Sequence, residues 1–456
     1  MTSPESVEKV TAADSKPPRK WRDALAVYLQ PRVLVVLFLG FSSGLPLALS
    51  GSTLLIWMRE AGVDLKTIGL FALVGTPYTI KFFWAPLVDA LHIPILTRLL
   101  GRRRAWLIFS QLLLMAAIVL LALSDPSKPL GVALAALFVA AASATQDIVI
   151  DAFRVESLPE NEQAAGMASY VAAYRVGMLL STAGALFLVS GFEGMGLNRH
   201  AAWQWGYIAM AALVVIGMVT ALFATEPESS RRSEDAGGTE RTFGRIVHAA
   251  TGAFSEFARF KDAWAILAFV VLFKFTDAFS GTMTAPFVID LGFTRNDYAA
   301  IVKGLGLGAT LLGGFAGGFL ASRYSLAASL WIGGILQAVA NLSFSWLALV
   351  GINHYALALA ITAENFTSAV GTVIFVAYIS ALCRNPAHTA TQYALLTALA
   401  AVGRTYLSSG AGYVAAATGW AWFFAICVVV AMPSFMLLAW LQARRHFETL
   451  TTPVKT

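Results

Sequence analysis

The stretch LGVALAALFVAAASATQDIVIDAF, residues 130–153, is an apolar run that carries two carboxylates, Asp147 and Asp151. As a single helix it is long enough to cross a hydrocarbon core, which takes about 20 residues. An ionised carboxylate near the middle of such a helix costs about 2.5–3.5 kcal/mol. Helix packing does not require a carboxylate at either position. The two acids therefore need a structural partner or a functional role.

Apolar runs of this kind recur along the whole chain. Of its 456 residues, 58% are hydrophobic and only 13% are charged, whereas soluble domains carry about 25% charged residues. A mean hydropathy of +0.70 excludes a water-soluble protein and predicts an all-α polytopic membrane protein, because a helix satisfies its own backbone polar groups in lipid. We expect twelve membrane-spanning helices, at residues 33–58, 67–91, 105–124, 130–153, 164–190, 201–224, 263–289, 297–321, 326–350, 354–382, 389–417 and 419–443.

The distribution of basic residues predicts the topology. Of the 32 Lys and Arg residues, 22 lie in tails and loops on the side of the N-terminus, and 5 lie on the opposite side. This asymmetry follows the positive-inside rule and predicts that both termini are cytoplasmic. The net charge of +6 therefore reflects topology and does not indicate a nucleic-acid partner. The first residues are polar and lack an apolar core, so we expect no cleavable signal peptide.

The chain divides into two similar halves. The segments REAGVDLKTIG (59–69) and IDLGFTRNDYA (289–299) align at a constant offset, which pairs Glu60 with Asp290 and Gly62 with Gly292. Two pseudo-symmetric six-helix bundles joined by a polar linker predict the major facilitator fold, whose parallel repeats surround a site at the membrane midplane. We expect cytoplasmic tails at 1–32 and 444–456, bundles at 33–224 and 263–443, and a cytoplasmic linker at 225–262.

A second feature of this fold follows span two, in the segment APLVDALHIPILTRLLGRRRAWL (85–107). An Asp at the end of the span followed by arginines resembles the facilitator loop signature, although Ala85 stands where the leading Gly usually does. Such an Asp can pair with helix ends or with the arginines and latch the halves on the cytoplasmic side. A simple positive-inside anchor explains the arginines but not the Asp. The candidate gating residues are Asp89, Arg102, Arg103 and Arg104.

The ionisable residues inside the predicted spans occur on only some of the twelve spans. In the major facilitator fold, spans one, four, seven and ten face a central cavity, and two, five, eight and eleven flank it. Every intramembrane charge lies on one of these eight spans, and none lies on three, six, nine or twelve, which predicts a shared aqueous cavity. The cations are Lys81, Arg175, Lys274, Lys303 and Arg404, and the anions are Asp147, Asp151, Asp277 and Glu364.

The four acids are candidate proton-coupling residues. Asp147 and Asp151, one helical turn apart on one face, repel each other when both are ionised, which favours proton uptake by one of them. An ion pair with Arg175 or Arg154 is the structural alternative. Glu364 has no cation nearby in the sequence and is a candidate proton or substrate site. Asp277, three residues after Lys274, forms either an internal salt bridge or a coupling pair with it.

The cations are candidate ligands for an anionic substrate. Lys81, Arg175, Lys274 and Arg404 can bind carboxylates or serve as counter-ions. Tyr78, one turn before Lys81, adds an aromatic surface. Lys303 is nearest the outer end of its span and can snorkel to the interface.

No metal, nucleotide or other cofactor is expected besides a proton gradient. Cys383 and Cys427 lie in or beside spans and support neither a disulfide nor a metal site, and the six histidines lack metal-binding spacing. The stretch GLGLGATLLGGFAGG (304–318) lacks the third glycine of a nucleotide-binding GxGxxG loop, because Ala309 stands there. Small residues at close helix contacts explain it better.

Three segments together resemble the anhydromuropeptide permeases (AmpG family) of Gram-negative bacteria. They are residues 40–89, GRRRAW (101–106) and SATQDIVIDAF (143–153), and the likeness covers about residues 31–227. Members of that family import GlcNAc–1,6-anhydro-MurNAc peptides for cell-wall recycling and depend on the proton-motive force. The resemblance implies functional roles for Asp147 and Asp151 and substrate-binding roles for Gln146, Ser43 and Ser50.

The resemblance implies a monomeric importer of an anionic glycopeptide in the bacterial inner membrane. Importing an anion against 100 mV, inside negative, costs about 2.3 kcal/mol per charge, and co-transported protons cancel that cost. A facilitator for another solute, such as a peptide, siderophore, drug or acyl-CoA, is the alternative. A membrane-embedded enzyme or sensor is least favoured, because no loop is large enough for a catalytic domain and no catalytic set is evident.

Overall fold

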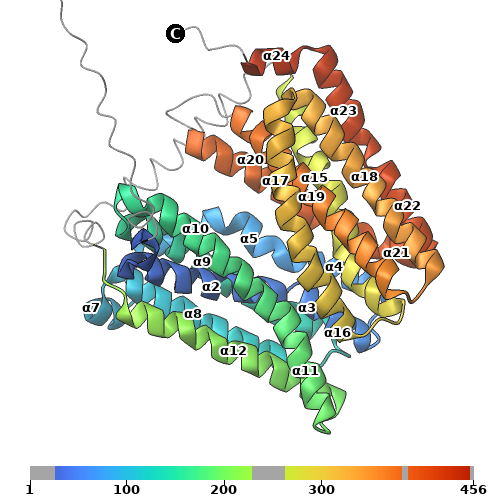
Figure 1. Ribbon diagram of the computed structural model, residues 1–456. Helices are drawn as coiled ribbons and strands as arrows, with labels where there is room; N and C mark the ends of the chain where they lie inside the picture. Colours follow the sequence, from blue (N-terminus) through green and yellow to red (C-terminus); the bar gives the residue numbers. More distant parts are fainter. Residues whose placement is uncertain (1–25, 228–261, 383–388, 452–456) are drawn as a thin grey trace, which may run out of the picture.

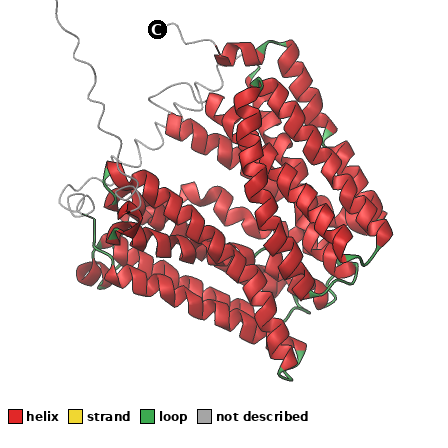
Figure 2. Ribbon diagram, in the orientation of Figure 1, coloured by secondary structure: helices red, strands yellow, loops and turns green. Residues whose placement is uncertain are grey.

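The computed structural model describes residues 26–227, 262–382 and 389–451. Within these ranges the chain forms helices and no strands (Figure 2). The helices form two bundles, one from each half of the chain (Figure 1). Ten helices in the described ranges are long and apolar enough to cross a membrane. The prediction of an all-α membrane fold built from two helical bundles is therefore confirmed.

The helices follow the predicted spans in order. In the first half they are η1 (Val27–Leu29), α2 (Pro31–Leu49), α3 (Ser52–Glu60), α4 (Leu65–Leu70), η2 (Phe71–Gly75), α5 (Thr76–Ile80), η3 (Lys81–Phe83), α6 (Ala85–Ala90), α7 (Leu96–Leu100), α8 (Arg102–Ala122), α9 (Pro129–Ser157), α10 (Glu160–Leu179), η4 (Leu180–Gly184), α11 (Ala185–Gly194) and α12 (Arg199–Phe223). In the second half they are α15 (Ala263–Asp290), α16 (Arg295–Asp297), η5 (Tyr298–Leu305), α17 (Gly306–Arg323), α18 (Leu326–Val350), α19 (His354–Leu382), α20 (Thr389–Tyr406), η6 (Leu407–Gly410), α21 (Ala411–Thr418), α22 (Trp420–Val430), α23 (Met432–Ala443) and α24 (His446–Thr451).

Four spans contain turns that are not α-helical. Spans two and eleven are interrupted by the 3₁₀ turns η2 and η6, and spans five and eight by the π-helical turns η4 and η5. Spans two and eleven are therefore series of short helices rather than the single helices expected. In span two the reason is visible in the sequence, because Pro77 and Pro86 lack the N–H that continues a helix and start new ones.

The two aligned segments of the halves fold into the same turn. Gly62 and Gly292 both adopt positive φ, 85° and 98°, and end the helices α3 and α15. Two residues later Asp64 and Thr294, which also correspond, cap the next helix by accepting a hydrogen bond from a backbone N–H. The offset read from the sequence is thus a structural repeat.

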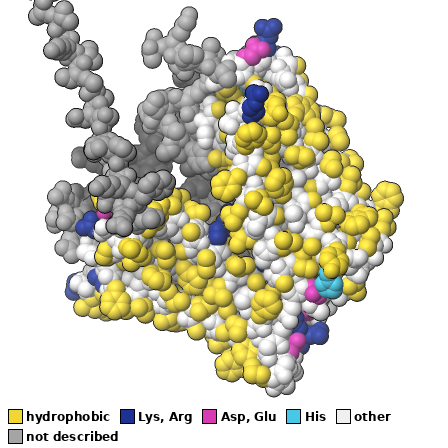
Figure 3. All heavy atoms as spheres, viewed as in Figure 1, with side chains coloured by type: hydrophobic (Ala, Val, Ile, Leu, Met, Phe, Trp, Pro, Cys, Tyr) yellow, Lys and Arg dark blue, Asp and Glu magenta, His cyan; other side chains and the backbone are white. Residues whose placement is uncertain are grey.

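The outer surface of the bundles is apolar. Figure 3 shows hydrophobic side chains over most of the visible face, with charged side chains mainly near its ends. On α17 this lipid-facing stripe includes Leu312, Phe315 and Phe319, all more than 60% exposed. The described helices thus present the surface expected of a protein in a bilayer.

The glycines of α17 support the packing interpretation of residues 304–318. A Cβ added at Gly313 would lie 2.2 Å from the backbone oxygen of Phe366 on α19, and one at Gly317 would lie 2.9 Å from that of Val370. A Cβ at the adjacent Gly314 would meet nothing within 4 Å. The glycine-rich stretch therefore lets α17 and α19 approach closely, as small residues do in membrane helix pairs.

We predict that Gly313→Ala destabilises the protein, because α17 and α19 must separate to accept the new methyl group. Overpacking of this kind costs about 1–3 kcal/mol, so the melting temperature in detergent should fall by several degrees. Gly314→Ala is the matched control and should leave the melting temperature unchanged or slightly higher. Equal melting temperatures for the two variants would contradict the close contact.

Candidate functional site

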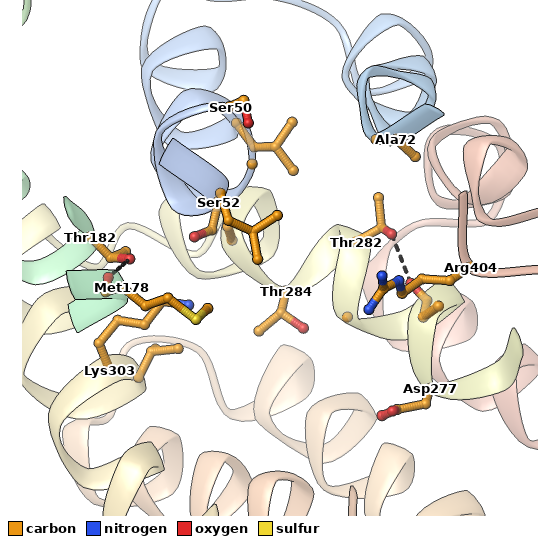
Figure 4. A pocket seen from close by; sticks show the side chains of 18 of the residues that line it. Ser50, Ser52, Ala72, Met178, Thr182, Asp277, Thr282, Thr284, Lys303 and Arg404 are labelled. Atoms are coloured by element: carbon orange, nitrogen blue, oxygen red, sulfur yellow. Dashed lines mark hydrogen bonds between the residues drawn. The ribbon is translucent and has the colours of Figure 1, made fainter. Parts of the chain in front are cut away.

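A cavity of about 730 Å³ lies between the two halves. Its lining comes from spans one, two, four and five of the first half and seven, eight, ten and eleven of the second. In Figure 4, Asp277, Lys303 and Arg404 come from the second half, and Ser50, Ser52 and Met178 come from the first. These are the eight spans on which the sequence places all the intramembrane charges.

Seven of the twelve predicted proton-coupling and substrate-binding residues line this cavity. Lys303 also lines it, although the sequence left open that it snorkels to the interface. The other five of these twelve lie outside the lining: Lys81, Ser43, Gln146, Asp151 and Lys274. Those that line it are Ser50, Tyr78, Asp147, Arg175, Asp277, Glu364 and Arg404.

Asp147 is held by hydroxyl groups behind the cavity wall. Ser43 on α2 donates a hydrogen bond of 2.5 Å to its carboxylate, and the Ser43 hydroxyl also lies 2.9 Å from that of Tyr170 on α10. Gln146, the preceding residue, is fully buried within the first half. Three helices therefore fix the orientation of Asp147 at the edge of the cavity.

Asp151 has a different environment from Asp147. Its carboxylate lies 3.5 Å from the guanidinium of Arg154, and its side chain is half exposed. This is the structural ion pair that the sequence allowed as an alternative. Because Asp151 is half exposed and lies beside the Arg154 cation, solvent and Arg154 screen its charge from Asp147.

The second half carries a small polar network around Asp277. Lys274 donates to Asp277 at 2.6 Å and to Thr372 at 2.9 Å, and Ser368 donates to the other carboxylate oxygen at 2.8 Å. The salt bridge that the three-residue spacing allowed is therefore formed. Whether this pair also participates in coupling stays a prediction.

Glu364 faces the cavity without a salt bridge. The neighbouring Asn365 amide donates to it at 2.9 Å, and among the described residues no cation lies within 4 Å of its carboxylate. Asn365 is itself tied to Thr310 on α17 at 3.3 Å. Neither Asn365 nor Thr310 could be singled out from the sequence, because single polar residues are common in apolar helices.

Three cavity cations have no carboxylate partner within 4 Å in the described ranges: Arg175, Lys303 and Arg404. Lys303 lies 5.6 Å from the centroid of the Tyr298 ring, close enough for a cation–π contact. Cations exposed to a cavity and not neutralised by the protein can bind anions there. The cavity thus combines unpaired cations with the carboxylates of Asp147 and Glu364.

The halves meet at one end of the molecule, where α3 and α4 lie against α15 and α21 (Figure 1). A Cβ at Gly412 would lie 1.9 Å from the backbone oxygen of Leu65, and one at Gly69 would lie 2.7 Å from the Gly412 nitrogen. The irregular turns also meet here, since η4 contacts η5 and η2 contacts η6. Toward the ends of α10 and α20 the bundles diverge (Figure 1).

Ion pairs join the halves at the same closed end. Arg59 donates to both carboxylate oxygens of Asp290, one of them at 2.8 Å. Arg295 donates to Glu60 and to Glu193, each at 2.6 Å. The sequence aligned Glu60 with Asp290 but assigned neither a role, because their partners are far away in the chain.

The predicted gating arginines lie at the opposite end of the first half. Arg103 donates to Glu156 at 2.5 Å, and its backbone N–H donates to Glu226 at 2.8 Å. Arg104 donates to the backbone oxygen of Ala221 at 2.9 Å, and Arg102 is buried. Asp89 is in α6, but its side chain is not among those described. These contacts lie within the first bundle and the first residues of the linker, and the gating role stays a prediction.

A fold of two six-span halves around a charged central cavity defines a major facilitator transporter. The family profile of the Major Facilitator Superfamily matches residues 36–406. The Escherichia coli K12 anhydromuropeptide permease is 40% identical over 416 residues, 91% of this chain and 80% of that one. A Rickettsia conorii chain that bears the transporter name AmpG 4 is 34% identical, over 92% of this chain and 98% of that one.

Two solved structures with similar folds are distant from this chain in sequence. A POT family transporter has a TM-score of 0.67 at 13% identity, covering 92% of this chain and 96% of that one. A D-xylose–proton symporter has a TM-score of 0.63 at 12% identity, covering 90% and 97%. The chain belongs to the major facilitator superfamily and, within it, to the anhydromuropeptide permease family. It is a multi-pass membrane transporter rather than an enzyme.

We predict that Asp277→Asn lowers the melting temperature, because it leaves the Lys274 ammonium unpaired within the bundle. Removing one partner of a fully buried ion pair costs about 3–5 kcal/mol of the free energy of unfolding. We expect a smaller loss here, because both side chains are partly exposed. The double variant Lys274→Met/Asp277→Asn should recover most of the lost stability. Glu364→Gln, which leaves no cation unpaired, is the control and should change stability little. An equal loss in all three variants would argue against the salt bridge.

Proposed function

We propose that this protein imports anhydromuropeptides across the bacterial inner membrane together with protons. The cargo is suggested by the name of the Escherichia coli permease, to which the chain is 40% identical. The observation that carries the proposal is the set of unpaired cavity cations, Arg175, Lys303 and Arg404. Muropeptides carry carboxylates, and guanidinium groups bind carboxylates with charge-assisted hydrogen bonds.

The sugar part of such a cargo would meet the aromatic side chains of the first half. Tyr78 and Tyr174 line the cavity, and the Tyr174 ring stacks on Tyr170 with centroids 6.1 Å apart. Aromatic rings provide flat surfaces with a hydroxyl at one end, which suits the mixed apolar and polar faces of a sugar. The cavity is thus compatible with a bulky glycopeptide, bound by a single protein chain.

The distribution of Lys and Arg supports an orientation with both termini in the cytoplasm. In that orientation the closed end faces the periplasm, and the described conformation is open to the cytoplasm. It is the state from which an importer releases its cargo. The transporter would then alternate with a conformation that opens toward the periplasm.

Protons would be carried by acids that reach the cavity. Asp147 and Glu364 line it, and no cation among the described residues lies within 4 Å of either carboxylate. An acid of this kind can hold a proton in one conformation and release it in the other. Each proton that moves inward with the cargo offsets one negative charge that moves against the membrane potential, about 2.3 kcal/mol per 100 mV.

We predict that Asp147→Asn and Glu364→Gln impair proton coupling while leaving cargo binding intact. Proteoliposomes with an inward pH gradient should accumulate labelled anhydromuropeptide with wild-type protein and several-fold less with either variant. Exchange of labelled for unlabelled cargo without a gradient should persist. Asp125→Asn, on an exposed loop, is the matched control. If both variants accumulate cargo as wild type does, neither acid couples protons.

We also predict that Arg404→Gln raises the KM for anhydromuropeptide about tenfold or more, because it removes a charge-assisted contact worth about 1.5–3 kcal/mol. Arg444→Gln is the control for loss of a positive charge, since Arg444 is exposed near the end of α23. The measurement is initial uptake against cargo concentration. A chain that inserts into the membrane yet transports no anhydromuropeptide would point instead to another facilitator substrate.

A further inference from the structure

The five charged residues at the closed end form a reciprocal arrangement, here called the interlock: Arg59, Glu60, Glu193, Asp290 and Arg295. Each half contributes one arginine that bonds to carboxylates of the other half. Arg59 of the first half binds Asp290 of the second, and Arg295 of the second binds Glu60 and Glu193 of the first. We propose that this interlock is the outer gate of the transporter, which must be broken each time the cavity opens at this end.

Arg295 is the more deeply inserted of the two arginines. Its side chain is only 8% exposed, and it lies over the Trp203 ring at 5.6 Å from the centroid. Trp203 also donates to Glu60 at 3.0 Å. The described partners of the Arg295 side chain, two carboxylates and an indole, therefore all belong to the first half.

The Arg59 site is built in the same way on the second half. Asp290 accepts hydrogen bonds from Arg59 and, at 3.1 Å, from the indole of Trp420. Each arginine thus meets a carboxylate that a tryptophan of the receiving half also contacts. The receiving carboxylates Glu60 and Asp290 occupy corresponding places in the repeat, whereas the two arginines do not: at the same offset, Arg295 corresponds to Leu65.

Both sites lie at the ends of spans one and seven, where an opening movement would separate the halves. The contacts that surround them, of α3 with α15 and of α11 with α16, are also contacts between halves. The Arg59–Asp290 pair is bidentate, and Arg295 makes one bond to each of two carboxylates. Charge-assisted hydrogen bonds of this kind are among the stronger polar contacts in proteins. Their formation therefore biases the equilibrium toward the conformation described, and their loss should populate the one open at this end.

The test measures access to the cavity. In a background in which Cys383 and Cys427 are serine, Thr282→Cys places a thiol in the cavity lining. A membrane-impermeant maleimide applied to intact spheroplasts should label it slowly. Glu60→Gln or Arg295→Gln should raise the labelling rate about tenfold or more. Asp125→Cys, on the α8–α9 loop at the same end, verifies which side of the membrane the reagent reaches.

Arg199→Gln is the matched control, because Arg199 is 63% exposed and pairs at 3.5 Å with Glu193 of its own half. It should leave labelling unchanged.

The charge exchange Arg59→Asp/Asp290→Arg should label more slowly than either single variant. If Arg295→Gln does not fold, Glu193→Gln tests the same site. Unchanged labelling in well-folded variants of Glu60, Arg295 and Glu193 would overturn the gate. Labelling requires no cargo, so it is independent of muropeptide import.

Discussion

The cost of a charged side chain in hydrocarbon governs the architecture of this transporter. At about 2.5–3.5 kcal/mol for each such group, an ionisable residue in a span has to reach water or an opposite charge. The described side chains follow both routes. Arg175, Lys303, Arg404, Asp147 and Glu364 reach the central cavity, whereas Lys274 and Asp277 bind each other at its edge.

The same constraint acts differently at the two ends of the molecule. At the closed end, arginines of each half are satisfied by carboxylates of the other, so the charges stabilise the contact between halves. At the opposite end, Arg103 and Arg104 bond to Glu156, Glu226 and backbone oxygens within the first half. None of these described contacts joins the two bundles, so the bundles can separate at that end while the contacts stay formed.

Close packing and irregular turns complement the ion pairs. Gly69 and Gly412 bring spans two and eleven into backbone contact, which any larger residue would prevent. The 3₁₀ and π-helical turns occur in spans two, five, eight and eleven, which are among the spans that touch across the interface. Mid-helix turns of this kind often mark hinges, because their hydrogen bonds are weaker than those of an α-helix.

Sequence and structure agree best where a single helix carries the information. The twelve apolar runs, the repeat around Gly62 and Gly292 and the packing role of residues 304–318 all follow from local composition and spacing. Spacing also allowed the Lys274–Asp277 pair, because residues three apart on a helix are neighbours. The spacing left open the partner of Asp151, which the structure identifies as Arg154.

The sequence by itself determined that this chain crosses the membrane in two similar halves and that its charges belong to the spans around the centre. Hydropathy, charge distribution and helical periodicity are local properties, so they can be read without coordinates. Only the tertiary structure decided which charges meet, because the Arg59–Asp290 and Arg295–Glu60 pairs join residues more than 200 positions apart. Such pairs depend on how each helix is rotated and on which end of the two bundles is closed, and neither is encoded in any one segment.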